Sequence, residues 1–323
     1  MSGARRILGC LLGLALALAS WPAAANPFII EAQPTASFTA SFALRYWYGM
    51  GSTGKDLYDA TGSTLVSRLT YYDLQTHSLE GVMRLDHSSG LFWKGYVGGG
   101  LLTGGTLNDE DFPPAITPYS STLSNLDQQN LGYASVDFGG ALLRGADFRI
   151  DAFVGYHYLY ERMKAFGCTQ IASNSSVCNP AIDNSVAVIA QENTWQAIRV
   201  GLNADLPLFD RFRLNVDAAY LPYVWFSGND SHLLRIGSSP GDFTGPIPED
   251  GHGWGYQIDA VVSYRIDDNI SVGVGGRYWH EEANGYAHFE DHVVDTAAAA
   301  QVLDWKTDHY GVFLQGTYKF DPF

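Results

Sequence analysis

Hydrophobic and polar residues alternate along most of the chain. The pattern is clearest in four segments: 37–48, 148–158, 195–206 and 213–223. In the second segment the apolar positions alternate with Arg149 and Asp151, which fall on the opposite face. Because successive side chains of a β-strand point to opposite faces, a two-residue period predicts strands with one apolar and one polar face. We therefore expect an all-β protein.

Short and long connections alternate between the predicted strands. Tight turns are expected at four places: 88–90, 144–146, 209–211 and 267–269. Long polar segments are expected at five: 51–63, 104–128, 166–193, 227–253 and 283–307. These nine connections join ten antiparallel strands, and the alternation of short turns with long loops is typical of transmembrane β-barrels of the outer membrane. The segment 65–87 runs without a strong breaker for about twice the 9–11 residues that cross a membrane, so we expect the barrel to extend beyond the outer leaflet.

The composition narrows the class of β protein. Charged residues make up 16% of the chain and aromatic residues 14%, and there are 35 glycines. Soluble domains contain about 25% charged residues, so this chain is poor in charge. After the first 25 residues no apolar run is long enough for a membrane-spanning helix, which leaves the closed barrel as the membrane architecture. Aromatic residues are expected to form the interfacial girdles: Trp47, Trp93, Tyr96, Trp195, Trp225, Tyr278 and Trp279.

The N-terminus has the pattern of a secretory signal peptide. Arg5 and Arg6 precede an apolar run, and alanines at positions 23–25 offer a cleavage site, so residues 1–25 are expected to be removed. Residues 26–323 would then form a single barrel domain. Removal of the two arginines changes the formal net charge from −15 to −17. This acidity argues against nucleic acid as a partner.

Cysteines outside the signal peptide occur as one close pair. Cys168 and Cys178 both fall in the third long loop. In an exported protein such a pair is usually a disulfide, which we expect to stiffen the loop. Two free thiols are the alternative.

Two short polar motifs stand at the starts of long loops. Asp109 and Asp111 are two residues apart, as are Asp230 and His232, so each pair shares a face of an extended strand. Two carboxylates opposite an Asp–His pair can form a hydrolytic site, in which the aspartate orients the imidazole and the imidazole takes a proton from water. The alternative without catalysis is that both motifs are ordinary polar residues of solvated turns. Binding of Ca²⁺ or Zn²⁺ is a third interpretation, but no HxxxH or Asp-rich glycine loop accompanies the motifs, so we expect no metal.

With these two motifs in this order, the ten-stranded pattern resembles the omptins, outer-membrane endoproteases of Gram-negative bacteria. The likeness covers essentially the whole chain after the signal peptide. Shorter matches support it at four places: 54–58, 66–69, 155–156 and 318–320. The resemblance implies an aspartic-type endopeptidase in the bacterial outer membrane, with its active site facing the cell exterior and with peptides or proteins as substrates.

The resemblance also implies roles for individual residues. Asp109 and Asp111 match the aspartate pair of the family, and Asp230 with His232 match its Asp–His pair. In omptins these four residues activate a water that attacks the peptide bond directly, without a metal and without a covalent intermediate. Asp56 matches an acidic residue that helps to bind a basic side chain next to the scissile bond.

The sequence departs from the family at two places. Gly228 stands where the family has a second acidic specificity residue, so the expected pocket for Arg or Lys is weakened. Omptins also bind lipopolysaccharide through basic side chains on the outer wall, and residues 156–160 do not preserve their Tyr-x-Glu-x-Arg pattern. Three basic residues are candidates to replace it: Arg162, Lys164 and Arg199. A lipopolysaccharide requirement stays open; no other cofactor is expected, and the barrel is expected to be a monomer in contact with outer-membrane lipid.

Two further classes of function compete with the protease. Acidic loops would steer cationic substrates to the barrel, yet the same acidity is expected of loops that only need to be soluble. A non-catalytic barrel could therefore be an adhesin, a structural barrel or a narrow channel, although ten strands leave little room for a pore. A barrel lipase or lipid A deacylase using Ser231 and His232 is disfavoured, because adjacent residues of a strand face opposite sides.

Overall fold

The computed structural model describes residues 37–112, 117–127, 129–172 and 176–320, so the predicted signal peptide lies outside the described residues. The described chain consists of strands joined by turns and loops. In chain order the strands are β1 (Phe38–Tyr58), β2 (Leu65–His87), β3 (Leu91–Asp111), β4 (Ser120–Leu126), β5 (Gln129–Arg144), β6 (Arg149–Gln170), β7 (Ile182–Phe209), β8 (Phe212–His232), β9 (Ile247–Arg265), β10 (Ile270–Ala287) and β11 (Gln301–Lys319). Among the described residues, no helix is long and apolar enough to cross a membrane.

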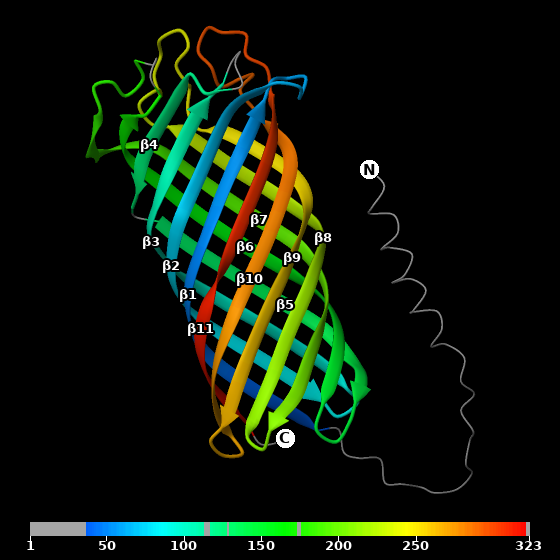
Figure 1. Ribbon diagram of the computed structural model, residues 1–323. Helices are drawn as coiled ribbons and strands as arrows, with labels where there is room; N and C mark the ends of the chain where they lie inside the picture. Colours follow the sequence, from blue (N-terminus) through cyan, green and yellow to red (C-terminus); the bar gives the residue numbers. More distant parts are fainter. Residues whose placement is uncertain (1–36, 113–116, 128, 173–175, 321–323) are drawn as a thin grey trace, which may run out of the picture. The chain divides into compact units, whose positions relative to one another are not determined.

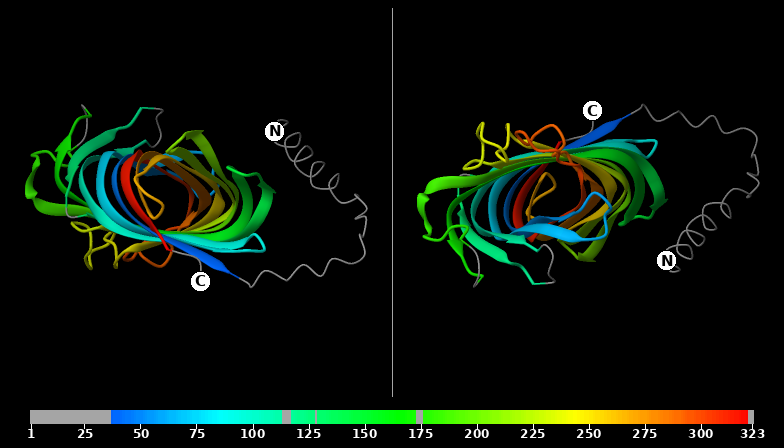
Figure 2. Two further views of the ribbon diagram at one scale, coloured as in Figure 1. Left: turned by 90° about the horizontal axis from the view of Figure 1, so that it is seen from below. Right: turned by 90° about the horizontal axis from the view of Figure 1, so that it is seen from above.

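The strands form one antiparallel sheet that closes into a barrel (Figure 1). β1 pairs with β2 on one side and with β11 on the other, so the first and last strands are neighbours. β4 and β5 share one place in the ring, because β4 pairs with one part of β3 and β6 while β5 pairs with another. The 11-stranded sheet therefore has ten places around its ring, which confirms the predicted ten-stranded antiparallel barrel. Seen along its axis, the ring is oval (Figure 2).

The two ends of the barrel differ in their connections. Short turns join the strands at one end, and longer loops join them at the other (Figure 1). The strands run further toward the loop end than predicted, since β1 continues to Tyr58, β3 to Asp111 and β8 to His232. The predicted loops were therefore too long at all five places: 51–63, 104–128, 166–193, 227–253 and 283–307. Beyond the membrane the outer face of a strand need not be apolar, so the hydrophobic alternation fades although the backbone hydrogen bonding continues.

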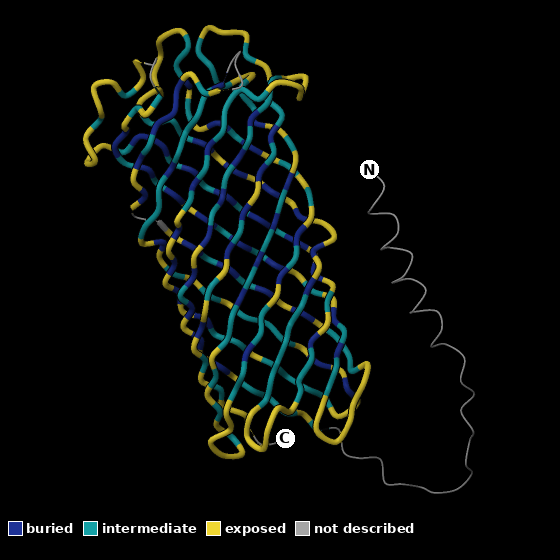
Figure 3. Tube along the Cα trace, viewed as in Figure 1, coloured by how far each residue is buried: buried dark blue, intermediate teal, exposed yellow. Residues whose placement is uncertain are grey.

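Apolar side chains cover the outer wall between the girdles. Leu79, Val97 and Leu314 are 70%, 66% and 62% exposed. Buried and exposed positions alternate along the strands (Figure 3). The predicted girdle residues Trp93 and Trp225 also face outward, at 55% and 43% exposure. A wall of this kind fits the hydrocarbon interior of a membrane.

Four aromatic residues predicted for the girdles lie in the lumen instead. Trp47, Trp195 and Trp279 are at most 2% exposed, and the ring of Tyr96 stacks on that of Trp279 at 5.9 Å. The guanidinium of Arg277 lies 4.3 Å from the ring of Trp279. The prediction was wrong because it counted aromatic residues without following the two-residue period, which puts Trp279 on the same face as Arg277.

Charged residues inside the barrel are paired. Arg277 contacts Glu80 at 2.7 Å and Asp259 at 2.6 Å, and Arg199 contacts Asp137 at 2.8 Å. Buried charges require such partners, because an isolated charge is costly to remove from water. Together with the buried aromatic residues, these pairs occupy much of the described lumen.

Bulges determine which residues face the lumen at the loop end. The pairing shifts register in three strands at a similar level: at 72–76 in β2, at 102–104 in β3 and at 221–224 in β8. A bulge adds one residue and so exchanges the inward and outward faces of the strand beyond it. Before the bulge in β8, the odd-numbered Asp217 faces the lumen, where it contacts Arg199. Beyond the bulge, the even-numbered Asp230 is the buried residue. The bulges thereby turn the ends of β3 and β8 so that their carboxylates face inward.

The predicted disulfide is present. Cys168 at the end of β6 is bonded to Cys178 in the following loop, with 5.6 Å between the two Cα atoms. The bond closes a short loop beside the outer end of β7.

Candidate active site

Asp230 and His232 form a hydrogen-bonded pair at the outer end of β8. The Nε2 atom of His232 lies 3.2 Å from Oδ2 of Asp230. Asp230 is 1% exposed, whereas 21% of the His232 side chain is accessible. The pair therefore has a buried carboxylate and an imidazole that solvent or a bound molecule can reach.

Asp109 and Asp111 end β3 and belong to the same site. Asp109 is half-buried, and its charge and that of His232 shift each other's pKa. Asp111 is also half-buried and lies opposite Ser67 in the pairing of β3 with β2. The structure thus brings all four residues of the two sequence motifs together, as the strand pattern predicted. In the described part of the chain, no group of three or more His, Cys, Asp or Glu side chains is arranged to hold a metal ion.

The site shifts the pKa values of its members in different directions. Burial, together with the neighbouring carboxylates Asp111 and Asp230, raises the pKa of Asp109 to about 6 against the lowering effect of His232. Burial also opposes ionisation of Asp230, but Lys55 and His232 hold the pKa of this carboxyl well below its usual range. Burial opposes the charged form of His232, yet Asp230 and Asp109 raise its pKa above the usual value. The carboxylate of Asp230 is therefore ionised and can accept a hydrogen bond from the imidazole N–H.

Lys55 on β1 reaches across the lumen to this pair. Its Nζ donates to Oδ2 of Asp230 at 2.7 Å and to Oε1 of Gln191 at 3.2 Å, and it forms an ion pair with Glu249. The Lys55 side chain is completely buried. Oδ2 of Asp230 therefore receives two contacts, one from the ammonium of Lys55 and one from the imidazole of His232.

Glu249 on β9 takes the space beside Gly228. A Cβ placed on Gly228 would lie 2.9 Å from Oε2 of Glu249 and 3.2 Å from Nε2 of Gln191. Glu249 is 3% exposed, and burial raises the pKa of its carboxyl. A carboxylate from the neighbouring strand β9 thus lies beside Gly228, and it is already paired with Lys55.

Asp56 lies apart from these residues. Its neighbours along β1, Lys55 and Leu57, are 2% and 4% exposed and face the lumen, so Asp56 points to the outer wall. There its two carboxylate oxygens accept hydrogen bonds from Arg68 of β2 at 2.6 and 2.9 Å. The structure therefore does not place Asp56 beside the Asp–His pair, and the lumen-facing residue at this level of β1 is Lys55.

The loop between β8 and β9 covers one side of His232. The ring of Phe243 meets the imidazole edge to face at 5.4 Å. On Phe243 lies the guanidinium of Arg235, 4.2 Å from the ring centre. Arg235 is exposed, and its charge lowers the pKa of Asp111 against the raising effect of burial. This loop therefore places an apolar wall and an accessible cation at the rim of the site.

The basic residues proposed to contact lipopolysaccharide do not share one surface. Arg199 lies in the lumen, where Asp137 and Asp217 bind it, so it is not available on the outer wall. The reason is its position in the two-residue period of β7, which it shares with the buried Trp195. Arg162 is on an exposed part of β6 and forms a 3.1 Å ion pair with Glu192.

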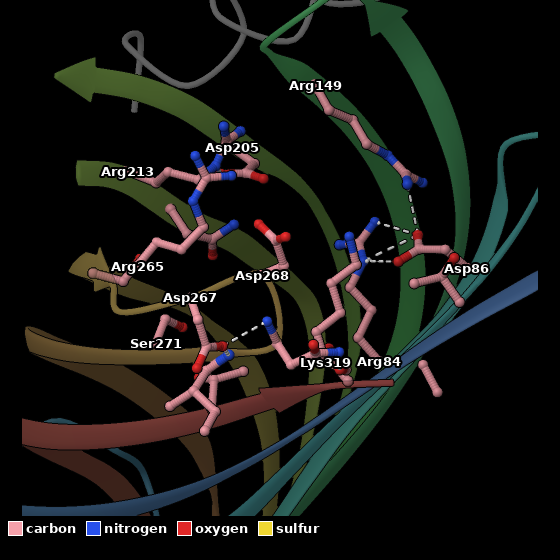
Figure 4. A pocket seen from close by; sticks show the side chains of 18 of the residues that line it. Arg84, Asp86, Arg149, Asp205, Arg213, Arg265, Asp267, Asp268, Ser271 and Lys319 are labelled. Atoms are coloured by element: carbon pink, nitrogen blue, oxygen red, sulfur yellow. Dashed lines mark hydrogen bonds and ion pairs between the residues drawn. The ribbon is translucent and has the colours of Figure 1, made fainter. Parts of the chain in front are cut away.

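A separate cavity opens at the turn end of the barrel. Its volume is about 530 Å³, and charged side chains of both signs line it (Figure 4). Arg84 and Arg149 converge there on the carboxylate of Asp86, at 2.9 and 2.6 Å. None of the four motif residues lines this cavity, so it is distinct from the site at the loop end.

Comparison with known proteins shows a likeness in fold. No family model and no curated protein sequence matches the chain. Among solved structures, the outer membrane protease OmpT from Escherichia coli matches 88% of this chain and 97% of its own, with a TM-score of 0.66 and 18% sequence identity. The chain has the fold of this outer-membrane protease. The toluene transporter TbuX from Ralstonia pickettii and the translocator domain of the autotransporter NalP from Neisseria meningitidis are more distant, with TM-scores of 0.34 and 0.33 at 8% identity.

Sequence reasoning missed Lys55, which contacts Asp230, and Glu249, which forms an ion pair with Lys55. Lys55 could have been found from the period of β1, because Trp47 and every second residue after it face the lumen. Glu249 gave no such signal, since it fell in a segment that was expected to be a loop. The OmpT-like fold extends β9 through this residue and so puts its carboxylate inside the barrel.

Proposed function

We propose that the protein is an outer-membrane endopeptidase that hydrolyses peptide bonds of peptides or proteins outside the cell. The observation that carries the proposal is the buried Asp230 bonded to His232, with Asp109 and Asp111 facing them at the loop end of the barrel. The fold shared with an outer-membrane protease supports the same conclusion. On this proposal the site faces the cell exterior and the barrel acts as a monomer.

In the proposed reaction His232 is the general base. Its Nε2–H donates to the ionised Asp230, so the lone pair of the neutral ring is on Nδ1. Nδ1 takes a proton from a water, the water oxygen attacks the carbonyl carbon of the peptide, and the imidazolium then gives the proton to the leaving amine. Asp230 stabilises the imidazolium while it carries the charge. No bond forms between protein and substrate.

Asp109 and Asp111 would hold the attacking water opposite the imidazole. Two carboxylates at the end of one strand offer acceptor oxygens for both hydrogens of a water. The pKa of Asp109, raised to about 6, leaves this carboxyl mostly ionised at neutral pH and able to accept such a hydrogen bond. Its negative charge also favours the imidazolium that forms when His232 takes the proton.

One observation favours a non-catalytic barrel. Lys55 contacts the same Oδ2 atom of Asp230 that His232 contacts, and an ammonium at this position competes with the imidazole for the carboxylate. An adhesin or a structural barrel would tolerate that arrangement without loss. The cluster of buried aromatic and aliphatic side chains inside the described part of the barrel argues against a channel.

The test is cleavage of a mixed peptide library by the refolded barrel, with and without lipopolysaccharide. Wild type is compared with His232→Ala and, as a matched control, with His87→Ala at the turn end, where His87 contacts Ser89. The proposal predicts cleavage by wild type and by His87→Ala, and none by His232→Ala. A folded wild-type barrel that cleaves nothing in either condition would leave the non-catalytic barrel as the better account.

A further inference from the structure

The buried ion group beside the Asp–His pair contains one cation and two carboxylates. Lys55 extends from β1 to Asp230 on β8 and to Glu249 on β9, and all three side chains are at most 2% exposed. Gln191 of β7 adds one amide oxygen, 3.2 Å from the Lys55 ammonium. Removing the ammonium would leave two buried carboxylates without a cation, which is costly in a medium of low dielectric constant.

The residues around the Lys55 side chain form a pocket that suits an alkyl chain ending in an ammonium. Nζ of Lys55 lies 5.2 Å from the ring centre of Trp305, within the range of a cation–π contact. Phe226 stacks on the same indole at 5.3 Å and holds it in place. Gly228 contributes no side chain, so the Glu249 carboxylate lies directly against its backbone. The site is therefore complete for a primary ammonium, and Lys55 itself occupies it.

This pocket adjoins the proposed catalytic pair. Asp230 belongs to both, because its Oδ2 contacts the Lys55 ammonium at 2.7 Å and the His232 imidazole at 3.2 Å. A side chain bound in the pocket would thus contact Asp230, the same carboxylate that contacts the proposed general base His232.

We propose that Lys55 is a specificity-determining residue whose own side chain fills a carboxylate-lined pocket, so that the native site accepts no basic substrate side chain there. Shortening Lys55 would open this pocket to a primary ammonium or to the side chain of a substrate lysine or arginine. The effect of Lys55 on substrate specificity rests on the proposed peptidase function, whereas the occupancy of the pocket by the Lys55 ammonium does not. Acidic loops can still attract cationic substrates at long range, but they do not decide which side chain lies beside the bond.

Cation binding is tested by thermal unfolding of wild type and Lys55→Ala in n-butylammonium chloride, with sodium chloride and tetramethylammonium chloride at equal ionic strength for comparison. The proposal predicts that n-butylammonium raises the Tm of Lys55→Ala by about 3–6 °C more than the other salts, and leaves wild type unchanged. Tetramethylammonium has no N–H donor, so it should not replace the Lys55 ammonium. Equal Tm values of Lys55→Ala in all three salts would overturn the proposal.

Two further variants separate this pocket from a general effect of removing a lumen lysine. Lys94→Ala is the matched control, because Arg199 still binds Asp137 and Asp217 when Lys94 is removed. Lys55→Ala combined with Glu249→Gln removes a carboxylate of the pocket. Neither variant should show the n-butylammonium effect, and an equal effect in either would contradict the assignment.

Substrate preference is measured on matched peptides that differ only in one Lys, Arg or Ala next to the scissile bond. Lys55→Ala should increase kcat/KM for the basic peptides relative to the Ala peptide by about tenfold over the wild-type ratio. If wild type cleaves no peptide, the thermal experiment still tests the pocket, so failure of the proposed function and failure of this inference are distinguishable.

If Lys55→Ala does not refold in sodium chloride, refolding should be restored by n-butylammonium and not by tetramethylammonium. The absence of that rescue would refute the occupancy of the pocket by the Lys55 ammonium.

Discussion

Replacement of Asp230 by asparagine tests whether this carboxylate orients His232. The change keeps the volume of the side chain but removes its charge and offers an N–H₂ donor where the imidazole now donates. His232 would then accept at Nε2 and carry its proton on Nδ1, the atom that is proposed to act as the base. We expect the variant to fold and to lose most of its peptidase activity.

The magnitude follows from the contacts that are lost. A hydrogen bond to a charged group contributes about 1.5–3 kcal/mol, and returning the imidazole to the productive tautomer costs one neutral hydrogen bond, about 0.5–1.5 kcal/mol. The total of about 2–4.5 kcal/mol corresponds to a decrease in kcat/KM of about 30- to 2,000-fold. Loss of the carboxylate also removes the main cause of the raised pKa of His232, so the residual activity should extend to lower pH.

The assay is the initial rate of cleavage of one library-derived peptide from pH 5 to pH 9. Asp250→Asn serves as the control, because Asp250 is exposed on β9 and the substitution makes the same change in net charge. Folding of each variant is checked by the heat-dependent shift of the barrel in electrophoresis. Activity of Asp230→Asn within about threefold of wild type, with an unchanged pH profile, would refute the role given to Asp230.

Three other predictions follow from the structure. Activity should fall as the pH decreases, because His232 must be neutral to act as a base and its pKa is raised, while Asp109 is protonated below about 6; a rate that rises toward pH 5 would contradict this assignment. Asp56→Asn should leave the relative cleavage of Arg and Ala peptides unchanged, since Asp56 faces the outer wall, and a selective loss of Arg cleavage would show that it binds substrate. Replacing Cys168 and Cys178 by alanine should lower the free energy of unfolding by about 2–3 kcal/mol and leave kcat/KM within about twofold, as measured by denaturant titration and by peptide cleavage.

The architecture was predictable because its signals are repeated along most of the chain. The alternation, the short turns and the low content of charged residues all point to a closed barrel, and each alternating segment supplies independent support. The predicted disulfide needed only the two cysteines and their spacing. Strand length at the loop end was underestimated, because hydrophobic alternation marks the membrane and not the hydrogen-bonded sheet.

The candidate site was predictable in its motifs and less so in its surroundings. Asp230 and His232 are two residues apart, so their common face follows from the strand geometry alone. Whether that face is the lumen depends on the bulge in β8, which a hydrophobic pattern does not reveal. For Asp56 the strand period would have been the better guide. The unbroken two-residue period of β1 puts Lys55 inward and Asp56 outward, whereas the family resemblance implied that Asp56 binds substrate.

Contacts across the lumen could not be read from the sequence. Lys55 and Glu249 are far apart in the chain, and their pairing depends on the closure and the oval section of the barrel. The ion group they form with Asp230 changes the expected chemistry of the site, because a pocket that was expected to be acidic already holds a cation.

The central claim is that the ends of β3 and β8 form one hydrolytic site, and the most direct test is a double-mutant cycle on kcat/KM. Wild type, Asp109→Ala, His232→Ala and the double variant are compared on one cleaved peptide, with Asp210→Ala at the turn end as the control. Residues that act as a unit are strongly non-additive, so each single variant should lose essentially all activity and the double variant should be no worse. Wild-type rates in either single variant, or losses that add in the double variant, would contradict a single site built from the two strand ends.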